Sequence, residues 1–347
     1  MLASIRLDWI IMVETPTRIL ITDFVWPSTA PEREVLTAGL GDGVEVVEAP
    51  DGSEETLAAL AVDCDGIMTC FAQVTPAVVR AAERCRVISR YGVGVDNIAV
   101  DLATELGIPV TYVPDYCVDE VSDHVMALLL TWNRQVGFYD GMAKAGRWEG
   151  TPSPHPLTRL RGQTIGILGF GRIGRAVAGK ARAFGLAALA YDPYLPSGAE
   201  LPDGVTAASM DDLLAASDYV TVHTPLNDQT RGLIGESAFQ RMKPSAYLIN
   251  CARGAIVDEP ALCDALRSGQ IAGAGLDVME SASPPADHPL FGMDNVIVTP
   301  HVAFLSQQSV LELEVRTARA TVDVLQGRMP EFLVNPAVLP RSRVTLG

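Results

Sequence analysis

The fold of this chain is decided by the stretch Thr164-Ile-Gly-Ile-Leu-Gly169-Phe-Gly171-Arg-Ile-Gly174. A short apolar run precedes a G-x-G-x-x-G pattern, and a helix-forming run follows it, which is the order strand, tight turn, helix. In that order Gly169 permits the turn, Gly171 lets the backbone approach a pyrophosphate, and Gly174 lets the helix pack on the strand. Free N–H groups at the start of the helix, with Arg172 beside them, would face the phosphates. The stretch therefore predicts a dinucleotide site.

An acidic residue stands where such a site needs one. The next predicted strand, Ala187 to Tyr191, ends at Asp192, about 20 residues beyond the glycines, as the motif requires. A carboxylate there accepts the ribose hydroxyls of NAD and repels the 2′-phosphate of NADP. We therefore expect NAD as the cofactor. The alternative interpretation is a tight turn without a ligand, with Asp192 as a solvated loop residue.

Outward from this stretch, β-branched runs alternate with helical runs on both sides of the Pro-rich segment 151–156. This alternation predicts βαβ units and parallel sheets. Strands are predicted at 18–24, 44–47, 66–69, 86–89, 109–112, 164–168, 187–191, 219–222, 246–250, 271–276 and 296–299, with long helices at 119–146 and 305–326.

We therefore predict an α/β protein with two doubly wound parallel-sheet domains. A Rossmann-type cofactor domain over 119–302 is expected to be inserted into a flavodoxin-like substrate domain formed by 1–118 and 303–347. A length of 347 residues suits about two domains. No appended regulatory domain is expected in the residues after Pro336.

Composition excludes several classes of partner. The formal net charge is −16, which argues against nucleic acid or an anionic membrane surface as a partner. No apolar run is long enough to cross a membrane. The six cysteines form no C-x-x-C pair and show no zinc spacing, so we expect no metal and a cytoplasmic location with reduced thiols. Residues 1–13 are expected to be an N-terminal extension rather than a signal peptide, because Asp8 interrupts their short apolar core.

Polar segments follow several predicted strands of the second series, at the sheet edge where open α/β sheets bind ligands. They are His223-Thr-Pro225, Asn250-Cys-Ala-Arg253, Gly275-Leu-Asp277 and Thr299-Pro-His301. Hydride transfer to a 2-keto acid needs a cation for the carboxylate and a proton donor for the carbonyl oxygen. The planar fork of arginine matches a carboxylate, and histidine exchanges a proton near neutral pH.

With these motifs in place, the chain resembles the D-2-hydroxyacid dehydrogenases, among them the phosphoglycerate dehydrogenases, from about Arg18 to Pro336. The similarity is concentrated in five motifs, which are Tyr91 to Asn97, Gly169 to Gly174, Asn250 to Asp258, Gly273 to Val278, and Pro300-His301. Residues 113–124 and 300–304 look closest to the C-terminal-binding-protein branch.

The resemblance implies reversible hydride transfer between NAD(H) and a small D-2-hydroxy acid, in a homodimer built on the helix 119–146. Arg253 would hold the substrate carboxylate, and His301 would be the acid/base. Arg90, Gly92 and Val93 would line the substrate side, although a surface ion pair is an equal alternative for Arg90. The cofactor residues would be Gly169, Gly171, Arg172, Ile173, Gly174, Asp192, His223, Thr224, Pro225, Cys251, Ala252 and Asp277. Among the other histidines, we expect His124 to pack on the long helix beside Asp123, and His155 and His288 to be solvated.

One departure from the family pattern is visible. In the family a glutamate before a proline hydrogen-bonds the catalytic histidine, whereas here Ala282 or Ser283 takes that position, depending on where the count begins. A neighbouring carboxylate favours the imidazolium form. We therefore expect His301 to be a weaker base, and keto-acid reduction to be slow or to need acidic pH. The rival function is a non-catalytic, NAD(H)-responsive binding protein. The loops at 70–72, 91–94 and Phe304 are moderately apolar and disfavour a phosphorylated substrate.

Overall fold

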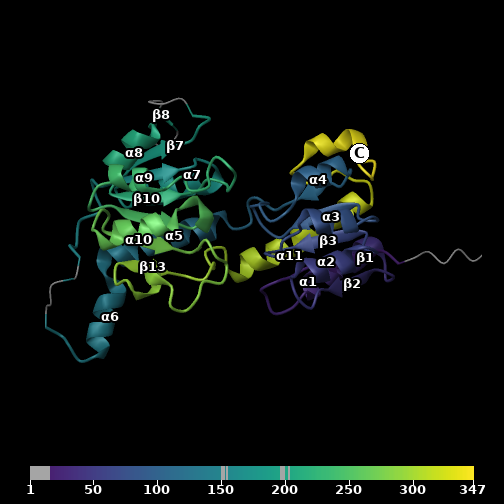
Figure 1. The fold of residues 1–347 in the computed structure, drawn as a ribbon, viewed down its shortest axis with the longest axis horizontal. Helices are drawn as coiled ribbons and strands as arrows, with labels where there is room; N and C mark the ends of the chain where they lie inside the picture. Colours follow the sequence, from purple (N-terminus) through teal and green to yellow (C-terminus); the bar gives the residue numbers. More distant parts are fainter. Residues whose placement is uncertain (1–15, 150–152, 154, 196–199, 202–203) are drawn as a thin grey trace, which may run out of the picture. The chain divides into compact units, whose positions relative to one another are not determined.

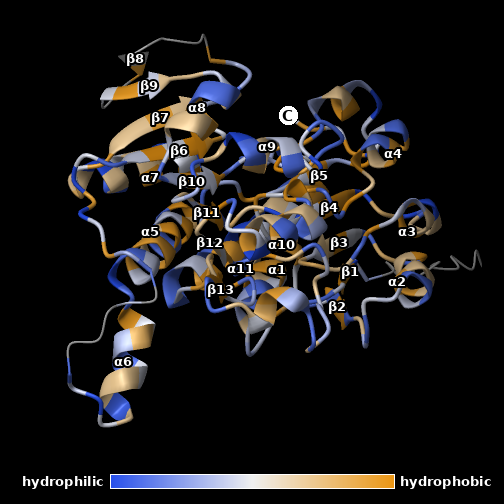
Figure 2. Cartoon of the chain, turned by 60° about the vertical axis from the view of Figure 1, so that its left-hand side comes forward, coloured by the Kyte–Doolittle hydropathy of each residue, from blue (hydrophilic) through white to orange (hydrophobic). Residues whose placement is uncertain are grey.

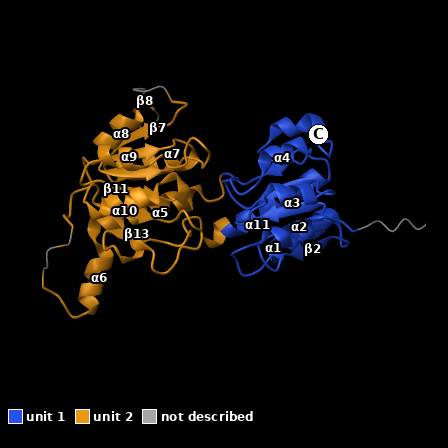
Figure 3. Ribbon diagram, viewed as in Figure 1, with its two compact units in different colours: residues 1–114, 310–347 blue, residues 115–309 orange. Residues whose placement is uncertain are grey.

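The computed structural model describes residues 16–149, 153, 155–195, 200–201 and 204–347 (Figure 1). The expected N-terminal extension and part of the Pro-rich segment lie outside these residues. The chain divides into two compact units (Figure 3): unit 1 is Met1–Pro114 with Val310–Gly347, and unit 2 is Asp115–Ser309. These bounds lie a few residues from the domain bounds proposed at 118/119 and 302/303.

Unit 1 contains a five-stranded parallel sheet in the order β2-β1-β3-β4-β5. This is the flavodoxin-like order expected for it. Its strands are β1 (Arg18–Ile21), β2 (Glu45–Glu48), β3 (Gly66–Thr69), β4 (Val87–Arg90) and β5 (Val110–Thr111). Its helices are α1 (Ala30–Leu40), α2 (Glu54–Ala61), α3 (Pro76–Ala81), α4 (Val100–Glu105) and the part of α11 (Gln307–Leu325) that follows Ser309.

The inner strands of unit 1 have no solvated face, whereas the edge strand β2 exposes Glu45 and Glu48. β3 and β4 are buried along their whole length, as expected when helices cover both faces of a parallel sheet. The helix α11 is joined to this sheet by a buried hydrogen bond of 2.7 Å from Thr321 Oγ1 to Ser89 Oγ.

Unit 2 contains an eight-stranded sheet in the order β13-β12-β11-β10-β6-β7-β9-β8. Every pairing is parallel except β8 with β9 at one edge. The strands are β6 (Thr164–Leu168), β7 (Ala187–Tyr191), β8 (Glu200–Leu201), β9 (Val205–Ala207), β10 (Tyr219–Val222), β11 (Tyr247–Asn250), β12 (Gly273–Leu276) and β13 (Val296–Val298). The helices are α5 (Val118–Arg134), α6 (Val136–Lys144), α7 (Arg172–Ala183), α8 (Met210–Ala216), α9 (Glu236–Arg241) and α10 (Glu259–Arg267).

The sheet of unit 2 buries both faces, and its strands alternate between two apolar clusters. In β11, Tyr247 and Ile249 belong to one cluster and Leu248 to the other, because successive side chains of a strand point to opposite faces. Figure 2 shows apolar residues concentrated on the strands. The strand order reverses between β6 and β10, and the two doubly wound α/β sheets confirm the predicted fold class.

One predicted element is wrong in detail, because the expected helix 119–146 breaks at Gln135. That residue adopts a left-handed backbone with φ 53° and ends α5, and its side-chain Nε2 donates to Trp132 O at 2.7 Å. The apolar spacing continues across the break, so periodicity alone did not reveal it. Figure 1 shows α6 extending away from the layers of unit 2, and Val136 and Phe138 on it are exposed.

No helix within the described part of the chain combines the length and the apolar character that crossing a membrane requires.

Candidate functional site

The polar residues that the sequence singled out come shortly after three consecutive strands of the unit 2 sheet, β11, β12 and β13. Asn250 of β11 is in register with Leu276 of β12, and Leu276 with Val298 of β13. Arg253, Asp277 and His301 follow these strand ends. Parallel strands bring such residues to one edge of the sheet, where open α/β sheets hold their ligands.

The loop that carries Arg253 is held by its own hydrogen bonds. Asn250 Nδ2 donates to Arg253 O at 2.9 Å, and Asn250 Oδ1 accepts from Ala252 N at 3.0 Å. The Arg253 guanidinium donates to Ala252 O at 2.8 Å. Burial raises the pKa of the neighbouring Cys251 thiol well above its usual value, with the Asp277 carboxylate adding to the effect. A raised pKa favours the neutral thiol of Cys251.

His301 lies in a loop with an uncommon backbone. Its φ is 55°, in the left-handed region that few non-glycine residues adopt. His301 N donates to Asp277 O at 2.8 Å and to Thr299 O at 3.1 Å. The imidazole stands edge-on to Phe304, with ring centroids 6.1 Å apart at 88°. An uncommon conformation held by surrounding contacts is typical of functional sites.

The glycine-rich turn has the shape that a pyrophosphate needs. Gly169 has a φ of 92°, and a Cβ there would lie 2.7 Å from the backbone of His223. A Cβ on Gly174 would lie 2.2 Å from Gly169 O, so no side chain fits between α7 and the turn. A Cβ on Gly171 would meet nothing within 4 Å. The space beside Gly171 is therefore open for a ligand that approaches the backbone at the start of α7.

Two polar groups beside this turn also fit a dinucleotide. Asp192 follows β7, and its Oδ2 accepts from Phe170 N at 3.0 Å, which places the carboxylate at the turn where a ribose would lie. Thr224 is buried, and within the described part of the chain its Oγ1 has no hydrogen-bond partner. A buried hydroxyl without a partner is uncommon, and a bound cofactor would supply one. Arg172 is exposed and Ile173 half-buried on the first turn of α7.

His223 lies beside the same turn. Burial lowers its pKa to about 3, and its Nε2 lies 2.9 Å from Thr221 Oγ1. His223 directly precedes Thr224 and Pro225, and the contact of these three residues with the cofactor stays a prediction.

The substrate-side residues predicted from the sequence belong to unit 1. Arg90 is 5% exposed, and its Nε donates to Gly94 O at 2.9 Å and to Asn97 Oδ1 at 3.1 Å. The surface ion pair considered for Arg90 is therefore wrong, because the guanidinium is buried within the loop that carries Gly92 and Val93. Contact of Arg90, Gly92 and Val93 with substrate stays a prediction.

Two other histidines differ from the expectation of solvation. His288 Nε2 lies 3.3 Å from Glu259 Oε2, with both side chains largely buried. The ring of His155 packs on Trp132 with centroids 4.4 Å apart, and burial lowers its pKa. Neighbouring elements bury both rings, and the sequence around each histidine gave no sign of them.

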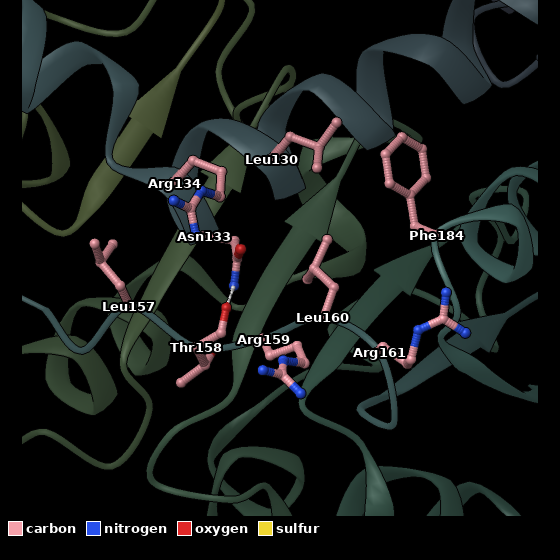
Figure 4. A pocket seen from close by; sticks show the side chains of 9 residues that line it. All are labelled: Leu130, Asn133, Arg134, Leu157, Thr158, Arg159, Leu160, Arg161 and Phe184. Atoms are coloured by element: carbon pink, nitrogen blue, oxygen red, sulfur yellow. Dashed lines mark hydrogen bonds between the residues drawn. The ribbon is translucent and has the colours of Figure 1, made fainter.

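Unit 2 also has a cavity of about 560 Å³ away from these residues (Figure 4). It lies at the end of α5 and combines guanidinium groups with apolar side chains. Its lining is Leu130, Asn133, Arg134, Leu157, Thr158, Arg159, Leu160, Arg161 and Phe184. None of the predicted site residues lines it. No group of three or more His, Cys, Asp or Glu side chains in the described ranges is arranged to hold a metal ion.

The contacts of Asp277 with Thr299, and of Thr299 with His124, were not predicted from the sequence. Thr299 Oγ1 donates to Asp277 Oδ1 at 2.6 Å, and His124 Nε2 of α5 lies 2.9 Å from Thr299 Oγ1. The contact joins residues far apart in the sequence, so no local pattern indicated it. His124 was expected only to pack on its helix.

The doubly wound sheet, its glycine-rich turn and Asp192 define unit 2 as a dinucleotide-binding domain. Residues 126–303 match the family model of the D-isomer specific 2-hydroxyacid dehydrogenase NAD-binding domain. The chain is 39% identical over 287 residues to a D-3-phosphoglycerate dehydrogenase of Mycobacterium leprae, with 82% of this chain and 52% of the relative covered. It is 38% identical over 297 residues to a glyoxylate reductase of Korarchaeum cryptofilum, with 84% of this chain and 89% of the relative covered.

Solved structures agree with these similarities. The D-lactate dehydrogenase of Aquifex aeolicus, complexed with NAD and lactic acid, superposes with a TM-score of 0.79 at 27% identity, covering 89% of this chain and 96% of that one. The chain spans about half the length of the phosphoglycerate dehydrogenases that it matches. The chain belongs to the D-isomer specific 2-hydroxyacid dehydrogenase family, and its cofactor is NAD. The branch predicted within the family, that of the C-terminal-binding proteins, stays a prediction.

Proposed function

We propose that this protein is an enzyme that interconverts a small 2-keto acid and the corresponding D-2-hydroxy acid, with NAD(H) as the redox partner. The observation that carries the proposal is the sheet edge of unit 2. There a guanidinium follows β11 and an imidazole follows β13, with Asp277 after β12 between them, and hydrogen bonds hold the imidazole's residue in a left-handed backbone conformation.

Each residue would have a distinct task. Arg253 would bind the substrate carboxylate through its planar fork and so fix the orientation of the reacting carbon. His301 would hold the proton that moves to or from the C2 oxygen. When bound, NADH supplies the hydride. Gly169, Gly171 and Gly174 would hold the pyrophosphate and Asp192 the ribose, while Thr224 lies beside the turn.

A small substrate is favoured over a phosphorylated one. The relatives are named phosphoglycerate dehydrogenase, glyoxylate reductase and D-lactate dehydrogenase. Membership of the family therefore does not specify the side chain of the substrate. The loops expected to surround it, 70–72 and 91–94, contain no lysine or arginine. The neighbouring Arg90 donates to Gly94 O and Asn97 Oδ1 within its own loop, whereas arginine is a common partner of phosphate groups.

The proposal is tested by NADH oxidation with glyoxylate, pyruvate, hydroxypyruvate and bulkier 2-keto acids across a range of pH. We expect turnover with at least one of them, and loss of that turnover in His301→Gln with NADH affinity retained. NADH binding without turnover on any 2-keto acid would favour the rival function, a non-catalytic NAD(H)-responsive protein.

We also propose that the protein forms a homodimer through α6 and the segment after it. Val136 is 57% and Trp148 is 84% exposed, and large apolar side chains at such exposure indicate an interaction surface when they lie together on one projecting segment. Leu157 and Phe184, which line the cavity at the end of α5, are also exposed and would extend this apolar surface.

Light scattering of the purified chain should give the mass of a dimer, and the double variant Val136→Glu/Trp148→Glu should give the mass of a monomer. Two buried acidic side chains would leave uncompensated charges in the interface. Phe291→Glu, on a ring of unit 2 that is 45% exposed and outside this segment, is the control and should stay dimeric. A monomeric wild type, or a double variant that stays dimeric, would contradict this interface.

A further inference from the structure

Asp277 is buried, and its carboxylate is tied to the loop that carries His301. Its Oδ1 accepts from Thr299 Oγ1 at 2.6 Å and from Val302 N at 3.0 Å. Its Oδ2 accepts from Ala303 N at 2.9 Å. Together with the bond from His301 N to Asp277 O, these contacts hold the backbone on both sides of His301.

This loop needs such support because of its backbone conformation. Among the described residues other than glycine, only Gln135 and His301 have a positive φ. A residue in this region keeps its conformation only when the surrounding structure fixes it. The hydrogen bonds from Val302 and Ala303 to Asp277 fix the residues that follow His301, and Thr299 fixes the approach to it.

His124 extends the same network to α5. A threonine hydroxyl has one proton, and Thr299 gives that proton to Asp277. The contact of 2.9 Å between Thr299 Oγ1 and His124 Nε2 must therefore be donated by His124, which assigns its proton to Nε2. His124 Nε2 is also 3.6 Å from Asp277 Oδ1. One histidine thus joins the helix α5 to the hydroxyl that orders the loop.

We propose that His124 and Thr299 are positioning residues that hold the His301 loop, through Asp277, in the conformation that proton transfer needs. This inference rests on the proposed function, since it takes His301 as the proton carrier. Neither His124 nor Thr299 needs to touch the substrate or the cofactor. Removal of either group would free the loop to leave its left-handed conformation, and the rate of the chemical step would fall while cofactor binding persists.

The kinetic test compares Thr299→Val, which removes the hydroxyl at constant shape, with Thr299→Ser, which keeps it. We expect Thr299→Val to lower kcat for the best 2-keto acid by roughly 10- to 100-fold, because misplaced catalytic groups cost about that much. The Kd for NADH should change less than about threefold, and Thr299→Ser should retain most of the rate.

His124 is tested with a pair of the same design. His124→Leu should lower kcat by about tenfold, and His124→Gln, whose amide can donate in place of Nε2, should recover part of that loss. The double variant His124→Leu/Thr299→Val should be no slower than Thr299→Val alone, since both residues act through one contact. Asp123→Ala, which removes an exposed neighbour of His124 on α5, is the control and should match the wild type.

A readout that does not depend on turnover separates this inference from the proposed function. Hydrogen exchange at the amides of Val302 and Ala303 should be protected in the wild type and at least about tenfold faster in Thr299→Val and His124→Leu. If the wild type reduces no 2-keto acid, the proposed function is wrong. The rates of hydrogen exchange at Val302 and Ala303 would still show whether His124 and Thr299 hold the loop. Unchanged exchange and unchanged kcat in both variants would overturn the inference, as would a loss of NADH affinity that parallels the loss of kcat.

Discussion

Replacing Arg253 by alanine is expected to lower kcat/KM for the 2-keto acid by roughly 30- to 5,000-fold. The guanidinium would make two parallel, charge-assisted hydrogen bonds to the substrate carboxylate. Truncation of one partner of a buried charge pair costs about 2–5 kcal/mol, and each 1.36 kcal/mol corresponds to about tenfold in rate. Steady-state kinetics with the best acceptor from the 2-keto acid panel measures the loss.

Variants at the same position separate charge from geometry. Arg253→Lys keeps the positive charge but not the planar fork, so its kcat/KM should lie between those of the wild type and Arg253→Ala. NADH affinity should change less than about threefold in both variants, because the role proposed for Arg253 concerns the substrate. Arg267→Ala removes an exposed arginine on α10 and should leave kcat/KM unchanged. The proposed role is wrong if Arg253→Ala keeps the wild-type kcat/KM, or if Arg253→Ala loses NADH affinity to the same extent as activity.

The dinucleotide site could be predicted from sequence because its determinants are local. Gly169, Gly171 and Gly174 lie within one turn and the helix that follows it, so the pattern that marks them is confined to six consecutive residues. Gly169 has a φ of 92°, and a Cβ on Gly174 would lie 2.2 Å from Gly169 O. The position of Asp192 follows from the length of one βα unit. Parallel sheets could be predicted for a related reason, since buried strands read as continuous apolar runs whatever their neighbours are.

Features that depend on distant contacts could not be predicted in this way. The contact of His124 with Thr299 joins residues far apart in the sequence, and the burial of Arg90 depends on Asn97 and on how its loop closes. The break at Gln135 was hidden because the apolar period continues through it. Ala282 is exposed in the loop after β12, and the expectation that its replacement of the family glutamate weakens His301 stays a prediction.

A pair of buried glutamates in unit 1 should make the stability of the folded chain depend on pH. Glu32 of α1 and Glu314 of α11 are both buried in unit 1, and Glu32 Oε1 accepts from Trp26 Nε1 at 3.1 Å and from Tyr91 OH at 3.2 Å. Burial, together with the neighbouring Glu32, raises the pKa of Glu314 to about 8, and burial also raises the pKa of Glu32. Two neighbouring carboxyl groups in a buried site cannot both ionise at low cost.

The sign of the pH effect follows from linkage. Glu314 has a folded-state pKa of about 8 against 4.5 as its ordinary value, so between those limits the folded chain binds more protons than the unfolded chain. Stability that is fully present below about pH 4.5 is therefore lost as pH rises through about 8, with a limiting slope of about 1.4 kcal/mol per pH unit. Solvent near the pair screens part of this effect.

Glu314→Gln should therefore be more stable than the wild type by about 1–2 kcal/mol at pH 8, and equal to it or slightly less stable at pH 5, because a neutral amide cannot ionise beside Glu32. Urea denaturation at both pH values measures the difference, and hydrogen exchange in α1 and α11 shows that it arises in unit 1. Glu312→Gln, an exposed glutamate on the same helix paired with Arg316, is the matched control and should not show a gain that depends on pH. If Glu314→Gln is no more stable than the wild type at pH 8, the prediction is wrong. Glu314 would then have an ordinary pKa in the folded protein, with its carboxyl group solvated or separated from that of Glu32.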